Sequence, residues 1–165
     1  MKQIILIIHN IRSSHNVGSL LRTAEGLGVE KVFLTGYTPY PALLHDERLP
    51  HIAARTGRQI SKTALGAEDT LAWEYTPDID LVINNVKKRG FEVIGLEQTT
   101  QSIPLPKLHA PDRIALVIGN EVTGIEKEVL KFCTLSVEIP MFGRKESFNV
   151  VQATAMALYH CRFRE

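Results

Sequence analysis

The chain has 165 residues, of which 44% are apolar and 22% charged, a composition typical of one globular domain with a sizeable core. The formal net charge is +1, which excludes a strong global attraction for polyanions but not a local basic patch. The two cysteines, Cys133 and Cys161, form no CxxC pair and have no zinc-like spacing with histidine, so we expect packing residues in a reducing, cytoplasmic compartment.

A strand, a polar loop, a helix and a second strand are predicted at the start of the chain. Residues 3–8 are a buried strand, since the apolar run is too short for a signal peptide or a membrane span. Residues 9–15 form the loop, and Asn16 lies at the expected N-cap of a helix that ends near Gly28. The second strand covers residues 31–35, and the unit is therefore expected to be parallel and right-handed.

Residues 36–67 interrupt this pattern with prolines, glycines and many cations, and only a short helix near residues 49–55 is predicted there. The acids of this stretch are Asp46 and Glu47. Its cationic or titratable basic side chains are His45, Arg48, His51, Arg55, Arg58 and Lys62. Two interpretations stay open, an ordinary solvated surface and a strip that faces phosphate groups.

The rest of the chain alternates strands with helices. The predicted strands are residues 71–75, 91–96, 114–118 and 135–139, and the predicted helices are residues 78–88, 126–132 and a closing helix that includes Tyr159. This order predicts an α/β fold, with a mainly parallel sheet flanked by helices, over a single domain of residues 1–165.

Two of these strands lead into polar loops. Strand 114–118 runs into Gly119-Asn120-Glu121 and Gly124, and strand 135–139 runs into a loop that ends at Ser147, a candidate N-cap. Ligands bind at the carboxyl edge of open α/β sheets, so both loops are candidates for one site. The alternative is that both are ordinary turns.

Several known sites are excluded by their missing motifs. The first strand is not followed by GxGxxG, and the chain contains neither GxxxxGK[ST] nor GxSxG. No cluster of His, Cys and carboxylate residues has zinc spacing, so we expect no metal.

Three segments resemble the motifs of the SpoU (TrmH-like) branch of the SPOUT RNA methyltransferases. They are residues 16–25 (NVGSLLRTAE), residues 118–124 (IGNEVTG) and residues 139–150 (IPMFGRKESFNV). The order and spacing also match, over essentially the whole chain. The resemblance implies transfer of a methyl group from S-adenosyl-L-methionine to a ribose 2′-hydroxyl of tRNA or rRNA. It also implies a C-terminal trefoil knot and a homodimer, and we expect no appended RNA-binding domain of the kind that many relatives carry.

The resemblance also implies roles for individual residues. The cofactor pocket is expected to be lined, largely through backbone groups, by Leu96, Gly119, Ile139, Met141 and Phe148. The catalytic candidates around the methyl acceptor are Asn16, Arg22, Glu121, Ser147 and Asn149. The RNA-binding candidates are the cations Arg12, Arg48, Arg55, Arg58, Lys62, Arg144 and Lys145.

Chemistry limits some of these roles. A guanidinium stays protonated in proteins, so Arg22 is expected to bind an RNA phosphate and ribose rather than to act as a base. Glu121 is expected to orient Arg22 or to anchor its own loop, and Ser147 has a second interpretation as a helix cap. Phe148 departs from the leucine usual in the family, which puts the pocket shape in doubt.

Two other functions stay open at this point. One is a non-catalytic module that binds RNA or S-adenosylmethionine with the same fold. The other is a Rossmann-like nucleotide enzyme, although the missing glycine fingerprint disfavours it. A titration with S-adenosylhomocysteine and a methyl-transfer assay on bulk RNA separate the three.

Overall fold

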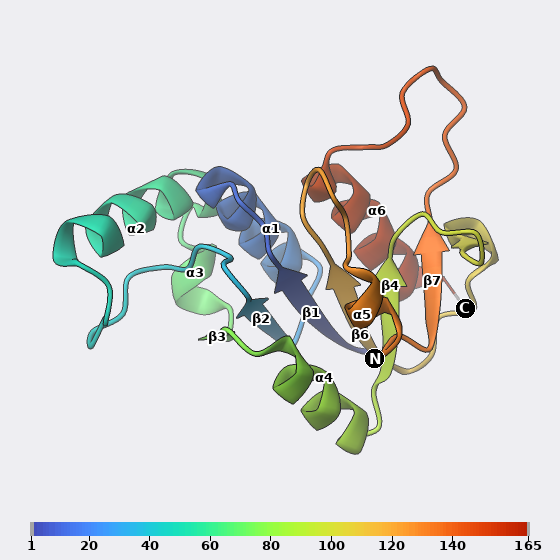
Figure 1. Ribbon diagram of the computed structural model, residues 1–165, viewed down its shortest axis with the longest axis horizontal. Coiled ribbons are helices and arrows are strands. Elements are labelled where there is room, and N and C mark those ends of the chain that lie inside the picture. Colours follow the sequence, from blue (N-terminus) through green and yellow to red (C-terminus); the bar gives the residue numbers. More distant parts are fainter. Residues whose placement is uncertain (1, 165) are drawn as a thin grey trace.

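The alternation of apolar strands and helices builds a seven-stranded sheet in which every pair of neighbouring strands is parallel (Figure 1). The computed structural model describes residues 2–164. The strand order is β3-β2-β1-β6-β4-β7-β5. The strands are β1 (Gln3–His9), β2 (Lys31–Thr35), β3 (Trp73–Thr76), β4 (Glu92–Leu96), β5 (Ile103–Pro104), β6 (Arg113–Ile118) and β7 (Leu135–Glu138). The α/β fold with a parallel sheet is thereby confirmed.

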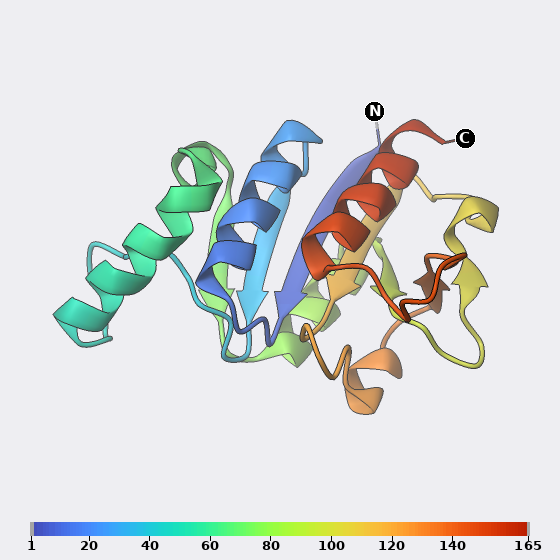
Figure 2. The ribbon, with the colours of Figure 1, turned by 90° about the horizontal axis from the view of Figure 1, so that it is seen from above.

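Helices cover both faces of the sheet (Figure 2). They are α1 (Ser14–Gly26), α2 (Pro50–Ala64), α3 (Ala67–Thr70), α4 (Ile79–Lys88), α5 (Lys127–Leu130) and α6 (Val150–Phe163), with a 3-10 turn at Leu105–Lys107. Helices α1, α2, α3 and α6 lie on one face, whereas α4 and α5 lie on the other. No helix among residues 2–164 is long and apolar enough to cross a membrane.

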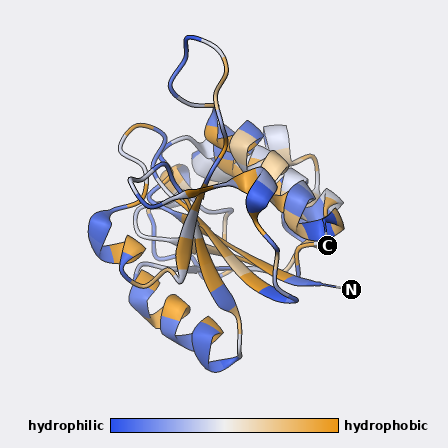
Figure 3. Ribbon diagram, turned by 90° about the vertical axis from the view of Figure 1, so that its right-hand side faces the viewer, coloured by the Kyte–Doolittle hydropathy of each residue, from blue (hydrophilic) through white to orange (hydrophobic). Residues whose placement is uncertain are grey.

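The central strands are apolar on both sides because both faces are covered. In β1, Ile4, Leu6 and Ile8 pack under α1 and α6, while Ile5 and Ile7 pack under α4. All five side chains are fully buried, and burying one such side chain contributes about 1.5–3 kcal/mol. Figure 3 shows the hydrophobic strands inside and the mixed colouring of the helices around them.

Two helices begin at residues other than those predicted. The α1 N-cap is Ser13, whose hydroxyl accepts from the Asn16 N–H at 3.2 Å, so the helix starts before Asn16. The α6 N-cap is Asn149, whose side chain accepts from the Val151 N–H at 2.9 Å. The predicted caps at Asn16 and Ser147 were therefore wrong, and their side chains are free for other contacts.

The long connection after β2 contains a longer helix than the sequence indicated. Helix α2 runs from Pro50 to Ala64, past Gly57, and packs directly against α1. A side-chain carbon at Gly18 of α1 would lie 2.2 Å from the Ile60 carbonyl oxygen, so the two helices touch through backbone. The predicted helix at residues 49–55 was too short.

The last part of the chain leaves the sheet and returns to it. After β6 it passes through α5 to β7, on the far side of β4, and α6 then packs beside α1 and on β6. The Arg162 guanidinium fastens α6 by donating to the carbonyl oxygens of Lys2, Leu27 and Gly28. The trefoil knot stays a prediction.

Candidate active site

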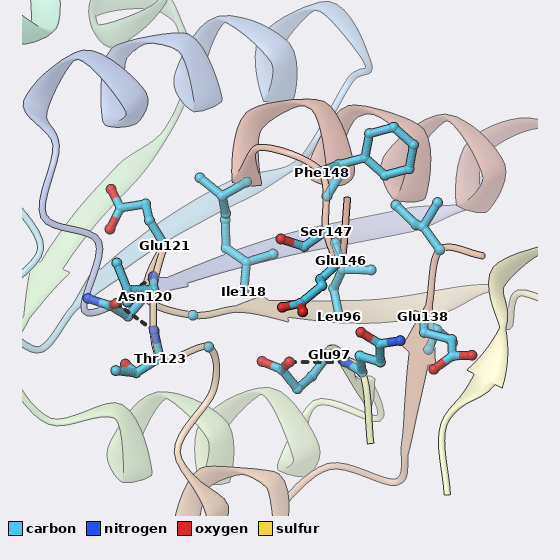
Figure 4. Close-up of a pocket in the computed structure, with 18 residues that line it drawn as sticks. Leu96, Glu97, Ile118, Asn120, Glu121, Thr123, Glu138, Glu146, Ser147 and Phe148 are labelled. Atoms are coloured by element: carbon cyan, nitrogen blue, oxygen red, sulfur yellow. Dashed lines mark hydrogen bonds between the residues drawn. The ribbon is translucent and has the colours of Figure 1, made fainter. Parts of the chain in front are cut away.

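A cavity of about 240 Å³ opens at the carboxyl edge of the sheet, where the two predicted loops meet (Figure 4). Its walls come from four segments: residues 96–98 from the end of β4, residues 118–124 from the end of β6, residues 137–139 from the end of β7, and residues 146–153 where α6 begins. Strands β4, β6 and β7 are neighbours in the sheet, which brings together segments that are distant in the sequence. The cavity therefore occupies the position expected for a ligand site in this fold class.

Four of the five predicted pocket residues line this cavity. These are Leu96, Gly119, Ile139 and Phe148. Met141 is not among the lining residues, because the chain after Ile139 turns away from the cavity before it returns at Glu146. The assignment of Met141 to the cofactor site stays a prediction.

The charge of the cavity was not predicted. Glu97, Glu121, Glu138 and Glu146 line it, and no Lys, Arg or His does so. The carboxylate of Glu97 accepts from the N–H groups of Ile125 at 2.7 Å and Gln98 at 3.0 Å, and Glu138 accepts from the Ser102 hydroxyl at 2.6 Å. This distribution of charge favours a cationic ligand over an anionic one. Within residues 2–164, no group of three or more His, Cys, Asp or Glu side chains is arranged to hold a metal ion.

Gly119 is required by the loop itself. A side-chain carbon there would lie 2.5 Å from the carbonyl carbon and oxygen of Gly124, which is too close for any residue but glycine. Asn120 and Gly124 close the loop with reciprocal backbone hydrogen bonds of 3.1 and 3.0 Å. A bulky residue at Gly119 would therefore disrupt this loop before it reached a ligand in the cavity.

Glu121 joins the loop after β6 to the start of α1. Its carboxylate accepts from the N–H groups of Arg12 at 3.0 Å and Ser13 at 3.1 Å, and from the side-chain amide of Asn16 at 3.1 Å. Burial alone raises the pKa of Glu121, but these donors outweigh it, so that the pKa is lowered and the carboxylate stays ionised. The geometry matches the anchoring role considered for Glu121, and Arg22 is not among its hydrogen-bond partners.

The other catalytic candidates lie around this junction in different ways. Ser147 lines the cavity, and Asn149 caps α6. Arg22 is exposed on α1 and lies outside the cavity lining, and its guanidinium makes no hydrogen bond or ion pair with residues 2–164. Arg22 is therefore available to a partner molecule.

The basic side chains divide into an exposed group and one that is held in place. The exposed ones are Arg12, Arg55, Arg58, Lys62, Arg144 and Lys145. Arg48 instead pairs with Asp46, donates to the carbonyl oxygens of Tyr40 and Pro41, and lies 3.6 Å from the centre of the Tyr40 ring. Because these contacts occupy the guanidinium, Arg48 holds its own loop. Its role in RNA binding stays a prediction.

His9 lies buried at the end of β1 in a polar network. Its Nδ1 is 2.8 Å from the Thr35 hydroxyl, and its Nε2 is 3.0 Å from the side-chain nitrogen of Asn10. Since the Asn10 nitrogen is a donor, His9 Nε2 must accept, which requires the neutral ring with its proton on Nδ1. Burial lowers the pKa of His9 from 6.5, against the opposing influence of Glu126.

This histidine predicts how stability depends on pH. The unfolded chain binds a proton at His9 near pH 6.5, whereas the folded chain does not, so the free energy of unfolding should fall as pH drops below 6.5. Urea titrations at pH 7.5 and 5.5 measure this change, and His9→Gln should reduce it. An equal change in the variant would show that His9 does not cause it.

Comparisons with known proteins agree with this architecture. The sequence model of the SpoU rRNA Methylase family matches residues 3–159. The 23S rRNA (guanosine-2′-O-)-methyltransferase RlmB of Neisseria meningitidis serogroup B is 31% identical over 159 residues, which are 96% of this chain and 58% of that protein. The chain thus spans less than two thirds of the length of that relative.

Solved structures show the same fold. The TrmH/SpoU tRNA modifying enzyme of A. aeolicus superimposes with a TM-score of 0.80 at 22% identity, over 98% of this chain and 75% of that one. The SpoU methyltransferase AviRb from Streptomyces viridochromogenes, solved in complex with the cofactor AdoMet, gives 0.79 at 20% identity, over 98% and 57% of the two chains.

Proposed function

The chain belongs to the SpoU rRNA methylase family, and we propose that it transfers the methyl group of S-adenosylmethionine to a ribose 2′-hydroxyl of tRNA or rRNA. The relative from Neisseria meningitidis is named as a 2′-O-methyltransferase, and AviRb was solved with AdoMet, which supports both the reaction and the methyl donor.

The observation that carries the proposal is the charge of the cavity. A cavity lined by four glutamates and no cation repels the phosphates of ATP or of a dinucleotide. S-adenosylmethionine is a nucleoside without phosphate, and its positive sulfonium and ammonium groups outweigh its one carboxylate, so that the molecule is a net cation. The residues present therefore fit this cofactor, and they disfavour the alternative of a phosphate-bearing nucleotide enzyme.

When bound, the sulfonium supplies an activated methyl group, and the chain's own residues must bring a ribose oxygen into line with it. The loop of Glu121 and the start of α1 are tied together, so the cavity and the exposed surface of α1 form one rigid frame. Such positioning can supply roughly 7–11 kcal/mol of the barrier. Arg22 holds an RNA phosphate by charge-assisted hydrogen bonds, and the proton of the hydroxyl leaves to that phosphate or to water.

Calorimetric titration of the purified chain tests the cofactor assignment. S-adenosylmethionine and S-adenosylhomocysteine should each bind with one site per chain, without added metal, and ATP should not bind. Binding of ATP alone would refute the assignment. Cofactor binding without any transfer to RNA would identify the chain as a non-catalytic module.

We also propose that the working unit is a cytoplasmic homodimer whose RNA surface combines exposed cations from two copies of this domain. Helix α6 exposes an aromatic pair, Tyr159 and Phe163, with 61% and 63% of their surface accessible and ring centres 4.7 Å apart. A second subunit packed on α6 would remove this apolar surface from water. Arg55, Arg58 and Lys62 would then occur twice on one assembly, which strengthens binding to RNA phosphates.

Sedimentation tests the dimer. At micromolar concentration the chain should sediment with twice its mass, and Tyr159→Glu should produce monomers that no longer methylate RNA. Leu81→Glu, at a residue that is 64% exposed on α4, is the matched control and should remain dimeric. An active wild-type monomer would refute this assembly.

A further inference from the structure

Asn10 has a backbone conformation that few residues adopt. It lies directly after β1 with a φ of 56°, and it is 92% buried, since only 8% of its surface is accessible. Asparagine is one of the few residues that tolerate this left-handed conformation. The conformation turns the side chain back under the loops that form the carboxyl edge of the sheet, where it makes several hydrogen bonds.

The side-chain amide of Asn10 connects three loops. Its oxygen accepts from the Tyr37 N–H at 3.1 Å, and its nitrogen donates to the carboxylate of Glu126 at 2.7 Å and faces His9 Nε2 at 3.0 Å. Gly36 leaves the space that the amide fills, because a side-chain carbon there would lie 1.9 Å from the amide oxygen.

The backbone of Asn10 reaches the cavity loop by a second route. The side chain of Asn120 donates to the Asn10 carbonyl oxygen at 3.0 Å. The same Asn120 side chain accepts from the N–H groups of Val122 at 2.8 Å and Thr123 at 3.0 Å, which fixes the turn that lines the cavity. Asn10 thus contacts both ends of the segment between Asn120 and Glu126.

Glu121 lies within this segment, directly after Asn120, and holds the start of α1. One buried asparagine therefore stands at the junction of the cavity loop and the loop that leads to Asn16 and Arg22. The side chains of the cavity loop and those of the loop that leads to Asn16 and Arg22 do not need Asn10 for their own chemistry. The position of one loop relative to the other depends on Asn10.

We propose that Asn10 is a positioning residue: it fixes the distance and angle between the methyl-donor cavity and the acceptor-side loop through Glu126 and Asn120. This inference rests on the proposed function, because it concerns the alignment of the two reactants. A misplacement of about 1 Å can lower a rate by about 100-fold without removing either binding site.

Two substitutions at Asn10 test the proposal. Asn10→Gly keeps the left-handed backbone accessible and removes the amide. Asn10→Asp keeps the shape and replaces the donor with a second carboxylate oxygen 2.7 Å from Glu126. Adding Glu126→Gln to Asn10→Asp restores a donor and an acceptor across the same contact, with the direction of the hydrogen bond reversed.

His9 and Tyr37 face the same amide and stay unchanged throughout. Asn84→Asp, exposed on α4 across the sheet, is the matched control.

The assay measures methyl transfer at saturating S-adenosylmethionine, with total RNA from a strain that lacks the gene, at a temperature where circular dichroism shows each variant folded. Asn10→Gly and Asn10→Asp should lower turnover by about 100-fold. The fold-change in their affinity for S-adenosylhomocysteine should be smaller than the fold-change in turnover by a factor of at least about ten. The double variant should recover most of the turnover that Asn10→Asp loses, and the Asn84→Asp control should match the wild type.

A purely structural role gives a different result, in which melting temperatures fall while turnover per folded molecule is unchanged. That result would overturn the proposal. The proposal would also be overturned if Asn10→Gly has normal turnover and Glu126→Gln does not relieve the defect of Asn10→Asp. Failure of the proposed function is distinguishable, since the wild type would then show no transfer.

Discussion

Arg22→Ala is expected to lower methyl transfer to RNA by about 100-fold or more while the affinity for S-adenosylhomocysteine stays within about threefold. Arg22 is exposed on α1, has no partner among residues 2–164, and lies outside the lining of the cavity. The free guanidinium can contact RNA but does not contact the cavity. Its loss should therefore lower the rate of methyl transfer and leave the affinity for the cofactor unchanged. Single-turnover kinetics and calorimetry measure the two quantities separately.

Arg89→Ala is the control for Arg22, because Arg89 is also exposed but pairs with Glu30 at 3.0 Å, away from the cavity. It should retain full activity. A collapse of cofactor binding in Arg22→Ala would show that Arg22 supports the fold of the site, and the role proposed for it would be wrong.

Ala153→Phe is expected to weaken binding of S-adenosylhomocysteine by at least about 100-fold, or about 2.8 kcal/mol. Ala153 lines the cavity from α6, and a phenyl ring in a volume of about 240 Å³ leaves no room for a nucleoside. The position avoids the loop strain that a substitution at Gly119 would introduce, so the variant should fold normally. Calorimetric titration measures the affinity, and thermal unfolding checks the fold.

An alanine-to-phenylalanine substitution at an exposed position is the control for Ala153→Phe. Ala54 is exposed on α2, and Ala54→Phe should bind the cofactor as the wild type does. If Ala153→Phe binds with unchanged affinity, the cofactor lies elsewhere and the assignment of the cavity fails.

The sheet was predictable from the sequence because its central strands are buried on both faces. Such strands appear as continuous apolar runs, as in residues 4–8 and 114–118, and the structure places strands at both. Helix starts were harder to predict, because several residues near each start can serve as caps. Ser13 rather than Asn16, and Asn149 rather than Ser147, accept the first N–H groups.

The site was predictable mainly where its residues belong to the motifs, with Leu96 as the exception. Glu97, Glu138 and Glu146 come from three separate segments, and only the strand order shows that they meet in one cavity. Glu97 follows β4 directly and Glu138 ends β7. Their place at strand ends was the available signal that they belong to the site, but strand ends carry many polar residues without function. The sequence also did not show that Tyr40 and Asp46 fold around the guanidinium of Arg48.

Nucleoside analysis of methylated RNA tests the central claim most directly. The purified chain is incubated with S-adenosylmethionine labelled on its methyl group and with total RNA from a strain that lacks the gene, and the RNA is digested and analysed by mass spectrometry. The labelled product should be a nucleoside methylated on the ribose 2′-oxygen, and Ala153→Phe should not form it. Label on a base, or no label in RNA although the cofactor binds, would contradict the proposed reaction.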